Sequence, residues 1–227
     1  MTQSVSTQTS AAISDVADIV AEYGPFPNTN AIHGVTFDGN RVWAATGTAL
    51  LAINPADKTI SSSLECICDA GTAFDGTHLY QLAGDRINKI DPANGSILSS
   101  IPAPGQGFDS GMTWAEGSLW VGQYRKRNIV EINPETGNII RTIASDRYVT
   151  GVTWVDGEFW HGTWEADESD LRRIDPDTGA VLHRLTMPAD MGISGVESDG
   201  ADLFYCGGGG SGKVRALRRP KMNKSLA

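Results

Sequence analysis

The sequence lacks the features that mark several large classes of protein. No apolar run among its 227 residues is long enough to span a membrane. Basic residues are not in excess either, since 18 Lys and Arg stand against 27 Asp and Glu, which gives a net charge of −9. A surface that binds nucleic acid needs an excess of positive charge. We therefore expect neither a nucleic-acid partner nor a membrane partner.

Cysteine is scarce, and the N-terminus carries no export signal. The first residues, MTQSVSTQTSAAIS, have neither the basic nor the apolar segment of a secretory signal peptide. The three cysteines are Cys66, Cys68 and Cys206, and the first two have C-x-C rather than C-x-x-C spacing. We predict a cytoplasmic protein with reduced thiols and no structural zinc. An exported chain with a trimmed signal, and a redox-sensitive Cys66–Cys68 pair on one side of a strand, are the alternatives.

One pattern repeats along most of the chain. The stretch from Gly151 to Leu182, GVTWVDGEFWHGTWEADESDLRRIDPDTGAVL, has short β-branched and aromatic runs separated by turn signals. The same frame begins at four other glycines: Gly34 (GVTFDGNRVW), Gly71 (GTAFDGTHLY), Gly111 (GMTWAEGSLW) and Gly195 (GVESDGADLF). Successive starts are separated by 37, 40, 40 and 44 residues.

This period indicates a propeller. A repeat of about 40 residues with four short strands is typical of one propeller blade. One aromatic residue keeps the same place in each repeat, as expected where large rings fill the space between blades: Trp43, Tyr80, Trp120, Trp160 and Phe204. We predict an all-β fold, a five-bladed β-propeller with four antiparallel strands per blade.

The two ends of the chain predict how the ring closes. The last repeat has three strands and stops at Pro220, whereas Ile19–Tyr23 has the composition of a spare strand. If this strand completes the last blade, no open edge remains. A helix over Ala12–Glu22 is the alternative, because its apolar residues have helical spacing. We predict a disordered tail over residues 1–13, a single propeller over residues 14–220 and a C-terminal tail over residues 221–227.

The topology directs unlike side chains to one mouth of the channel. The segments before the repeat glycines and the ends of the second strands converge there, and they differ strongly between blades. Loops that vary on a repeated scaffold usually carry function. The catalytic candidates are His161, Tyr148 and His33, and the substrate-binding candidates are Arg147, Gln81, Gln123, Trp164, Glu165, Asp109 and Cys206.

Several candidates have a plainer interpretation. His161 replaces a small or neutral residue of the other blades, and it could be a general acid or base, a metal ligand, or a hydrogen-bonded histidine of the channel wall. His33 could be a solvated loop residue, and Glu165 a solvated acidic tip. Arg147 with Tyr148 could clamp a carboxylate or phosphate, or lie on the rim. Trp164, similarly, could stack on a ligand or pack against a blade edge.

A glycine-rich run near the C-terminus has the spacing of a phosphate-binding loop. Gly207–Lys213 reads GGGGSGK, but Val214 occupies the place of the Ser or Thr that binds Mg²⁺. A strand-like run follows it, not a helix whose N-terminus could hold phosphate. We expect a loop between the second and third strands of the last blade.

Two runs resemble a known family. LYQLAG (Leu79–Gly84) and FWHGTWEADESDLRRIDPDTGAV (Phe159–Val181) resemble the matching runs of the plant and bacterial glutaminyl cyclotransferases. The resemblance covers about Gly34 to Val181 and implies a five-bladed propeller. Gln81 matches the family, whereas Ala44 stands where the resemblance places the catalytic glutamate. The streptogramin lyases and gluconolactonase-like propellers share a looser blade pattern, which implies a divalent metal at the channel mouth.

The polar groups expected at the mouth suit a pocket that binds a polar small molecule and moves protons. We predict an enzyme of the lyase, isomerase or hydrolase type that uses acid–base chemistry there. Glutaminyl cyclotransferase-like or metal-dependent streptogramin-lyase-like activity is an alternative, and so is a non-catalytic propeller that binds a ligand or protein. No cofactor and no metal-ligating residue are predicted, although a divalent metal remains an alternative.

Overall fold

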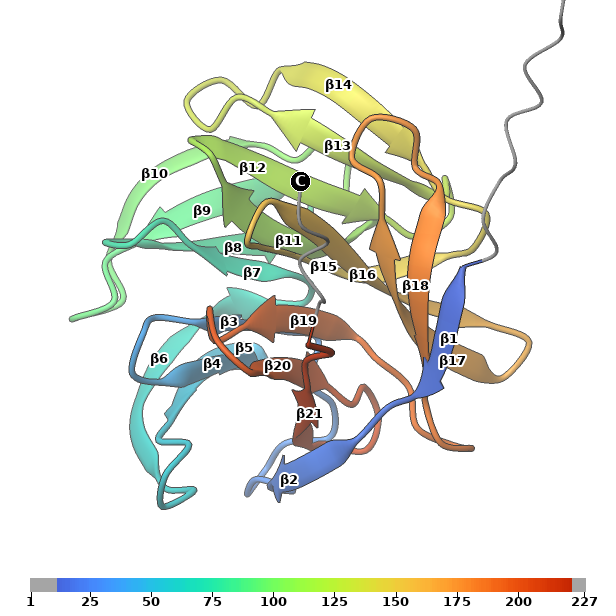
Figure 1. Cartoon of the computed structure of the whole chain (residues 1–227). Coiled ribbons are helices and arrows are strands. Elements are labelled where there is room, and N and C mark those ends of the chain that lie inside the picture. Colours follow the sequence, from blue (N-terminus) through green and yellow to red (C-terminus); the bar gives the residue numbers. More distant parts are fainter. Residues whose placement is uncertain (1–11, 222–227) are drawn as a thin grey trace, which may run out of the picture.

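Five sheets surround one axis in the structure, a computed structural model that describes residues 12–221 (Figure 1). Each sheet has four antiparallel strands that follow one another outward from the centre of the ring, and one sheet carries an additional parallel strand at its outer edge. The predicted five-bladed β-propeller is confirmed.

Blades 1 to 5 follow the order of the repeats, and each runs from its innermost strand outward. Blade 1 contains β3 (Gly34–Phe37), β4 (Val42–Ala45), β5 (Gly47–Ile53) and β6 (Ile60–Cys68). Blade 2 contains β7 (Thr72–Phe74), β8 (Leu79–Ala83), β9 (Arg86–Ile90) and β10 (Ile97–Pro102). Blade 3 contains β11 (Asp109–Ala115), β12 (Ser118–Gln123), β13 (Asn128–Ile132) and β14 (Ile139–Ala144). Blade 4 contains β15 (Val149–Val155), β16 (Glu158–Glu165), β17 (Glu168–Ile174) and β18 (Val181–Thr186).

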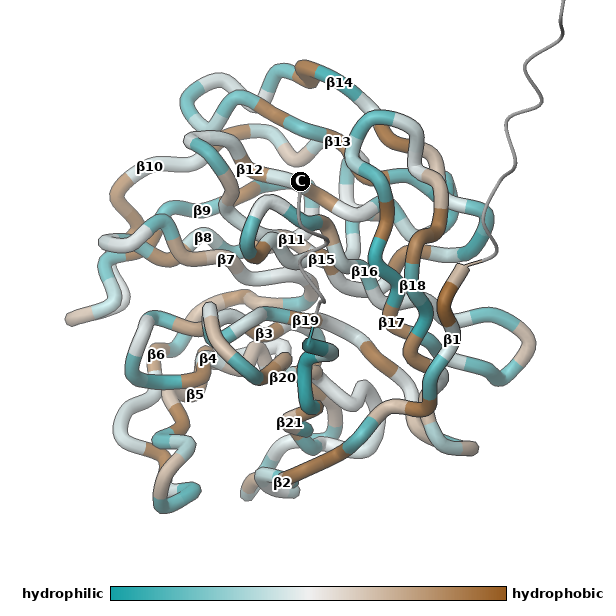
Figure 2. Tube along the Cα trace, in the orientation of Figure 1, coloured by the Kyte–Doolittle hydropathy of each residue, from teal (hydrophilic) through white to brown (hydrophobic). Residues whose placement is uncertain are grey.

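The N-terminal segment closes the ring. Blade 5 contains β19 (Gly195–Ser198), β20 (Leu203–Gly207), β21 (Val214–Arg218) and, as its outermost strand, β2 (Ile19–Tyr23). The pairing of β2 with β21 is antiparallel, and Tyr23 lies opposite Val214. Figure 2 shows an apolar stretch in β2 where this strand borders the blade. The closing strand is therefore confirmed, and the alternative helix is wrong because two strands occupy its place.

A further strand was not predicted. β1 (Ile13–Val16) pairs in parallel with β18 and gives blade 4 a fifth strand. Asp15 Oδ2 lies 2.8 Å from Nε2 of His183, which fixes this pairing at the outer edge of the blade. β1 starts at Ile13, one residue before the predicted domain boundary. The predicted tails otherwise fall on residues 1–11 and 222–227, which lie outside the described chain.

The blades meet at a ring of glycines. A Cβ added to Gly111 would lie 2.4 Å from the Cα of Gly151, and one added to Gly151 would lie 2.6 Å from the amide nitrogen of Val196. Gly195 also lies close to the next blade, since a Cβ added to it would be 2.9 Å from the Cα of Gly34. Only glycine permits such backbone contact, so the repeat glycine is required where innermost strands converge.

The repeated aromatic residues form the interfaces between blades. All five are at most 4% exposed, as predicted: Trp43, Tyr80, Trp120, Trp160 and Phe204. The rings of Trp160 and Phe204, in adjacent blades, have centroids 5.1 Å apart. These large buried side chains hold neighbouring sheets together.

Candidate functional site

Two adjoining cavities open at the mouth where the segments before the repeat glycines converge. The first, the mouth cup, has a volume of about 360 Å³ and is lined by Ala31, Ile32, His33, Asp69, Ala70, Asp109, Ser110, Tyr124, Thr150, Ser194, Gly209 and Gly210. The second, the aromatic cavity, has a volume of about 480 Å³ and is lined by Tyr124, Thr150, Trp164, Asp190, Gly192, Ile193, Ser194 and Gly208 to Ser211. Because five lining residues are common to both, the cavities form one continuous site across several blades.

Hydrogen bonds to both carboxylate oxygens hold Asp109 in position in the mouth cup. Its Oδ2 accepts a hydrogen bond of 2.8 Å from the Gly105 amide, and its Oδ1 accepts one of 3.2 Å from Nε2 of Gln123. Burial raises the pKa of the Asp109 carboxyl above its ordinary value, against the opposing effect of these hydrogen bonds. A positioned carboxyl group with a raised pKa, in a cup that the His33 imidazole also lines, is suited to proton transfer.

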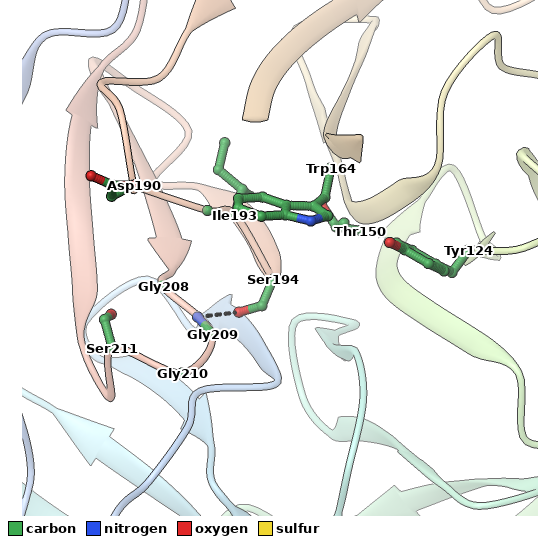
Figure 3. A pocket seen from close by; sticks show the side chains of 11 residues that line it. Tyr124, Thr150, Trp164, Asp190, Ile193, Ser194, Gly208, Gly209, Gly210 and Ser211 are labelled. Atoms are coloured by element: carbon green, nitrogen blue, oxygen red, sulfur yellow. Dashed lines mark hydrogen bonds between the residues drawn. The ribbon is translucent and has the colours of Figure 1, made fainter. Parts of the chain in front are cut away.

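Aromatic rings from two blades line the second cavity (Figure 3). Trp164 lies near the end of β16, and a Cβ on Gly192 would approach its ring to 3.1 Å, so the indole packs directly on this glycine. Tyr124 follows β12, and its hydroxyl end points toward Thr150 in Figure 3. Its ring stacks on that of Tyr148 at 4.7 Å between centroids. Tyr148, which lines neither cavity, therefore supports a lining residue from behind.

The glycine-rich run lines the aromatic cavity together with the Trp164 and Tyr124 rings. Gly208 to Ser211 lie in the loop between β20 and β21, as predicted. The Gly209 amide donates a hydrogen bond of 3.0 Å to Oγ of Ser194, drawn as the dashed line in Figure 3. The strand β21 directly follows the loop in the place where a phosphate-binding site has a helix, so the loop lacks a helix dipole.

The charge of the lining is negative. Three carboxylates and no Lys or Arg are among the described residues that line the two cavities: Asp69, Asp109 and Asp190. Carboxylates beside aromatic faces form a favourable environment for a positively charged or amine-bearing group.

The structure brings only three of the ten predicted site residues into the cavity lining: His33, Asp109 and Trp164. Gln123 lies beneath the cup as the hydrogen-bond partner of Asp109. Gln81 is fully buried, and its amide accepts a 2.6 Å hydrogen bond from Thr72 and donates one of 2.7 Å to the Leu82 carbonyl. This saturated network gives Gln81 a place in the blade framework, outside the lining.

Arg147 and Glu165 interact with each other on the rim. The Arg147 guanidinium donates hydrogen bonds of 2.9 and 3.0 Å to the carbonyls of Glu165 and Glu168. The Glu165 carboxylate forms an ion pair with Arg127. Both predicted residues thus lie in a rim network. Cys206, also outside the lining, is 2% exposed in the core between blades 4 and 5, and burial raises the pKa of its thiol.

His161 lies on β16 and is 1% exposed. Its partner in register is Val152, which packs in a cluster with Trp120 of blade 3, so the imidazole faces the neighbouring blade. Burial, followed by the charge of Arg172, lowers the pKa of His161 to about 4. Neither cavity includes it, because side chains in the middle of a second strand point between blades and only the innermost strands border the axis. Its catalytic role stays a prediction.

One buried acid on the axis was not predicted from the sequence. Glu197 lies two residues after a repeat glycine, and its carboxylate accepts hydrogen bonds from the hydroxyls of Thr36, Thr113 and Thr153 in three other blades. Burial raises the pKa of Glu197 to about 7. The signal was present in the repeat alignment, because the equivalent positions hold only Thr or Ala.

Within residues 12–221, no three His, Cys, Asp or Glu side chains gather into a group that could hold a metal ion. The same part of the chain forms no helix with the length and apolar character needed to cross a bilayer.

Comparisons with known proteins connect the chain to other propellers. The sequence matches no protein-family model and no curated protein. Among solved structures it is similar to the glutaminyl cyclase of Myxococcus xanthus, with a TM-score of 0.75, 17% identity and coverage of 92% of this chain and 98% of the other. The fold expected from the family resemblance is thus confirmed.

Two further structures are similar over most of this chain. The β-propeller domain of Myceliophteria thermophila Cps50 (Swd1) gives a TM-score of 0.58 at 10% identity and covers 90% of this chain and all of the other. The Kuenenia stuttgartiensis hydrazine synthase gives 0.50 at 15% identity, over 79% of this chain and 56% of the other. Proteins with different names thus share this architecture, so function must be argued from the site.

Proposed function

We propose that the mouth cup and the aromatic cavity bind a small polar molecule that carries an amine, and that Asp109 and His33 transfer protons to or from it. The reaction would be of the lyase, isomerase or hydrolase type. The observation that carries this proposal is the placement of Asp109, a fixed carboxyl group with a raised pKa, in a cavity without Lys or Arg.

Each of the two cavities would bind a different part of the ligand. Asp69 and Asp109 in the cup would attract the amine, and the Trp164 and Tyr124 rings would contact the apolar part of the ligand. Backbone groups of Gly209 and Gly210, which line both cavities, allow close approach because these residues have no side chain.

A matched pair of probes tests the binding step. Benzylamine and benzyl alcohol have nearly the same shape and differ in charge, so we expect the amine to bind at least tenfold more tightly at pH 8, by about 1.4 kcal/mol. Asp109→Asn should remove this preference, whereas Asp177→Asn, whose side chain is 86% exposed in a turn outside both cavities, should retain it. Equal affinity of the two probes for the unchanged protein, measured by calorimetry, would refute the proposal.

The reaction needs its own assay. The similarity to a glutaminyl cyclase makes a glutaminyl peptide amide the first substrate to try, with ammonia release as the readout. Ala44 occupies the place of the family's catalytic glutamate, so activity here would have to depend on Asp109 or His33 instead. Turnover that survives both Asp109→Asn and His33→Ala would remove these residues from the proposed chemistry.

One observation favours a second candidate, a propeller that binds protein. Large apolar side chains are more than half exposed on the outer strands of blades 2 and 3: Ile97, Leu98, Ile139 and Ile140. Exposed apolar surface of this kind can mark an interaction site. This candidate predicts that Ile139→Ser with Ile140→Ser abolishes a protein contact and leaves amine binding in the mouth unchanged.

A further inference from the structure

A pair of thiols lies at the end of the outermost strand of blade 1. Cys66 and Cys68 are two residues apart in β6, and both contribute to the same buried cluster, whereas the Ile67 side chain between them is 66% exposed. The two sulfurs therefore share one face of the strand. The β5–β6 register shifts between Ala49, opposite Glu65, and Gly47, opposite Cys68. The strand bends at such a bulge, which changes the spacing of the residues within it.

The two thiols interact and differ in accessibility. The interaction with Cys68 raises the pKa of the Cys66 thiol, and burial raises it further. The same interaction lowers the pKa of Cys68, so a thiolate of the pair forms first at Cys68. Cys68 is fully buried, whereas Cys66 is only partly buried and gives a reagent access to the pair.

The pair lies directly behind one wall of the mouth cup. Cys68 is followed in the chain by Asp69 and Ala70, which both line the cup. Gly47, opposite Cys68 in the sheet, borders the lining residue His33, since a Cβ on Gly47 would lie 3.5 Å from its Nε2. A change in the geometry of the thiol pair would therefore move the wall that carries Asp69 and His33.

We propose that Cys66 and Cys68 form a reversible disulfide on reaction with a peroxide, and that this disulfide changes the shape of the mouth cup. The Cys68 thiolate attacks one oxygen of hydrogen peroxide to give a sulfenic acid and hydroxide, and the hydroxide takes the proton of Cys66 and leaves as water. The Cys66 thiolate then displaces the sulfenic oxygen from Cys68, and this oxygen leaves as hydroxide and takes a proton from solvent to form the second water. Two thiols are thereby oxidised, and one peroxide is reduced to two waters.

Mass spectrometry of the full chain tests the bond. Treatment with hydrogen peroxide at low excess should lower the mass by about 2 Da, and a dithiol reductant should restore it. The bond should map to the peptide that contains both Cys66 and Cys68, and the buried Cys206 should keep its free thiol. Cys66→Ser, a change at a partly exposed position, should abolish the mass loss, whereas Cys206→Ala should retain it. Absence of the mass loss in the unchanged protein would overturn the proposal.

Hydrogen exchange tests the coupling to the cup without any ligand. The oxidised protein should show altered exchange at Asp69 to Thr72 and at Thr46 to Ala49, with unchanged exchange in blade 4, which serves as an internal control. A disulfide that forms without any change in these two segments would refute the effect on the cup. This readout does not depend on amine binding, so its outcome is separate from that of the proposed function.

Discussion

The Thr113 hydroxyl of blade 3 donates a hydrogen bond of 3.3 Å to Oε2 of Glu197 in blade 5. Thr36 of blade 1 donates to the same oxygen, also at 3.3 Å, and the backbone amide of Ser198 donates to Oε1 at 2.9 Å. All of these donors are uncharged. One buried acid is thus tied to several blades across the axis, with no positive side chain among its hydrogen-bond partners.

The stability of the ring should depend on the protonation of Glu197. Burial raises its pKa in the folded chain to about 7 from 4.5, so folding favours the protonated form. The stabilisation from this proton is complete below pH 4.5 and is lost as the pH rises through 7. We expect this group to lower the free energy of unfolding by about 3 kcal/mol between pH 5 and pH 8.

Urea unfolding of the unchanged protein and of Glu197→Gln at several pH values measures this effect. Glutamine keeps the shape of the side chain without the titrating group, so the difference between the two proteins should change in favour of Glu197→Gln as the pH rises. A difference that stays constant from pH 5 to pH 8 would contradict the prediction.

The pKa shift of His161 should make stability depend on pH in the opposite direction from that of Glu197. Its pKa is lowered to about 4 by burial and by Arg172, so folding favours the neutral ring and stability is lost as the pH falls from 6.5 toward 4. We expect the imidazole resonances of His161 in a nitrogen–proton NMR spectrum to remain those of a neutral ring at pH 5.5. Titration of this ring near pH 6.5 in the folded protein would show that the side chain reaches solvent.

The repeat glycines should tolerate no side chain. Gly111→Ala would place a Cβ 2.4 Å from the Cα of Gly151, a backbone atom that cannot move without displacing blade 4. We expect a loss of more than about 3 kcal/mol in the free energy of unfolding. Gly210→Ala is the matched control, because nothing lies within 4 Å of its added Cβ. Similar thermal midpoints for the two variants would contradict the close packing of the ring.

The two N-terminal strands should differ in importance. Removal of residues up to Val16 deletes β1, which only extends the outer edge of blade 4, and should lower the thermal midpoint by a few degrees. Removal up to Gly24 also deletes β2, which exposes the buried Val214 and Ala216 and leaves blade 5 incomplete. We expect the longer deletion to lose cooperative unfolding, followed by circular dichroism. A sharp transition in both truncated proteins would refute this difference.

The repeat pattern was sufficient to predict the fold, and much less of the site followed from it. The spacing of the glycines and of aromatics such as Trp160 determines blade number, because these positions pack in the same way in every blade. The direction of a single side chain depends on the pleat of its strand. His161 and Gln81 directly follow the repeated aromatic, and they face the space between blades. Among the residues before the glycines, His33 and Asp109 line the mouth as predicted, whereas Arg147 and Tyr148, ahead of Gly151, lie outside the lining.

The pairing of β2 with β21 also has a consequence for biosynthesis. It joins Ile19 to Leu217, so the first strand of the ring finds its partner only after the strands that lie between these residues in the sequence have been synthesised. Until then β2 has no partner strand, so its backbone hydrogen-bonding groups remain unpaired. Contacts between residues so far apart in the sequence also form slowly. Chaperone dependence of the nascent protein should therefore be greatest just before β21 emerges.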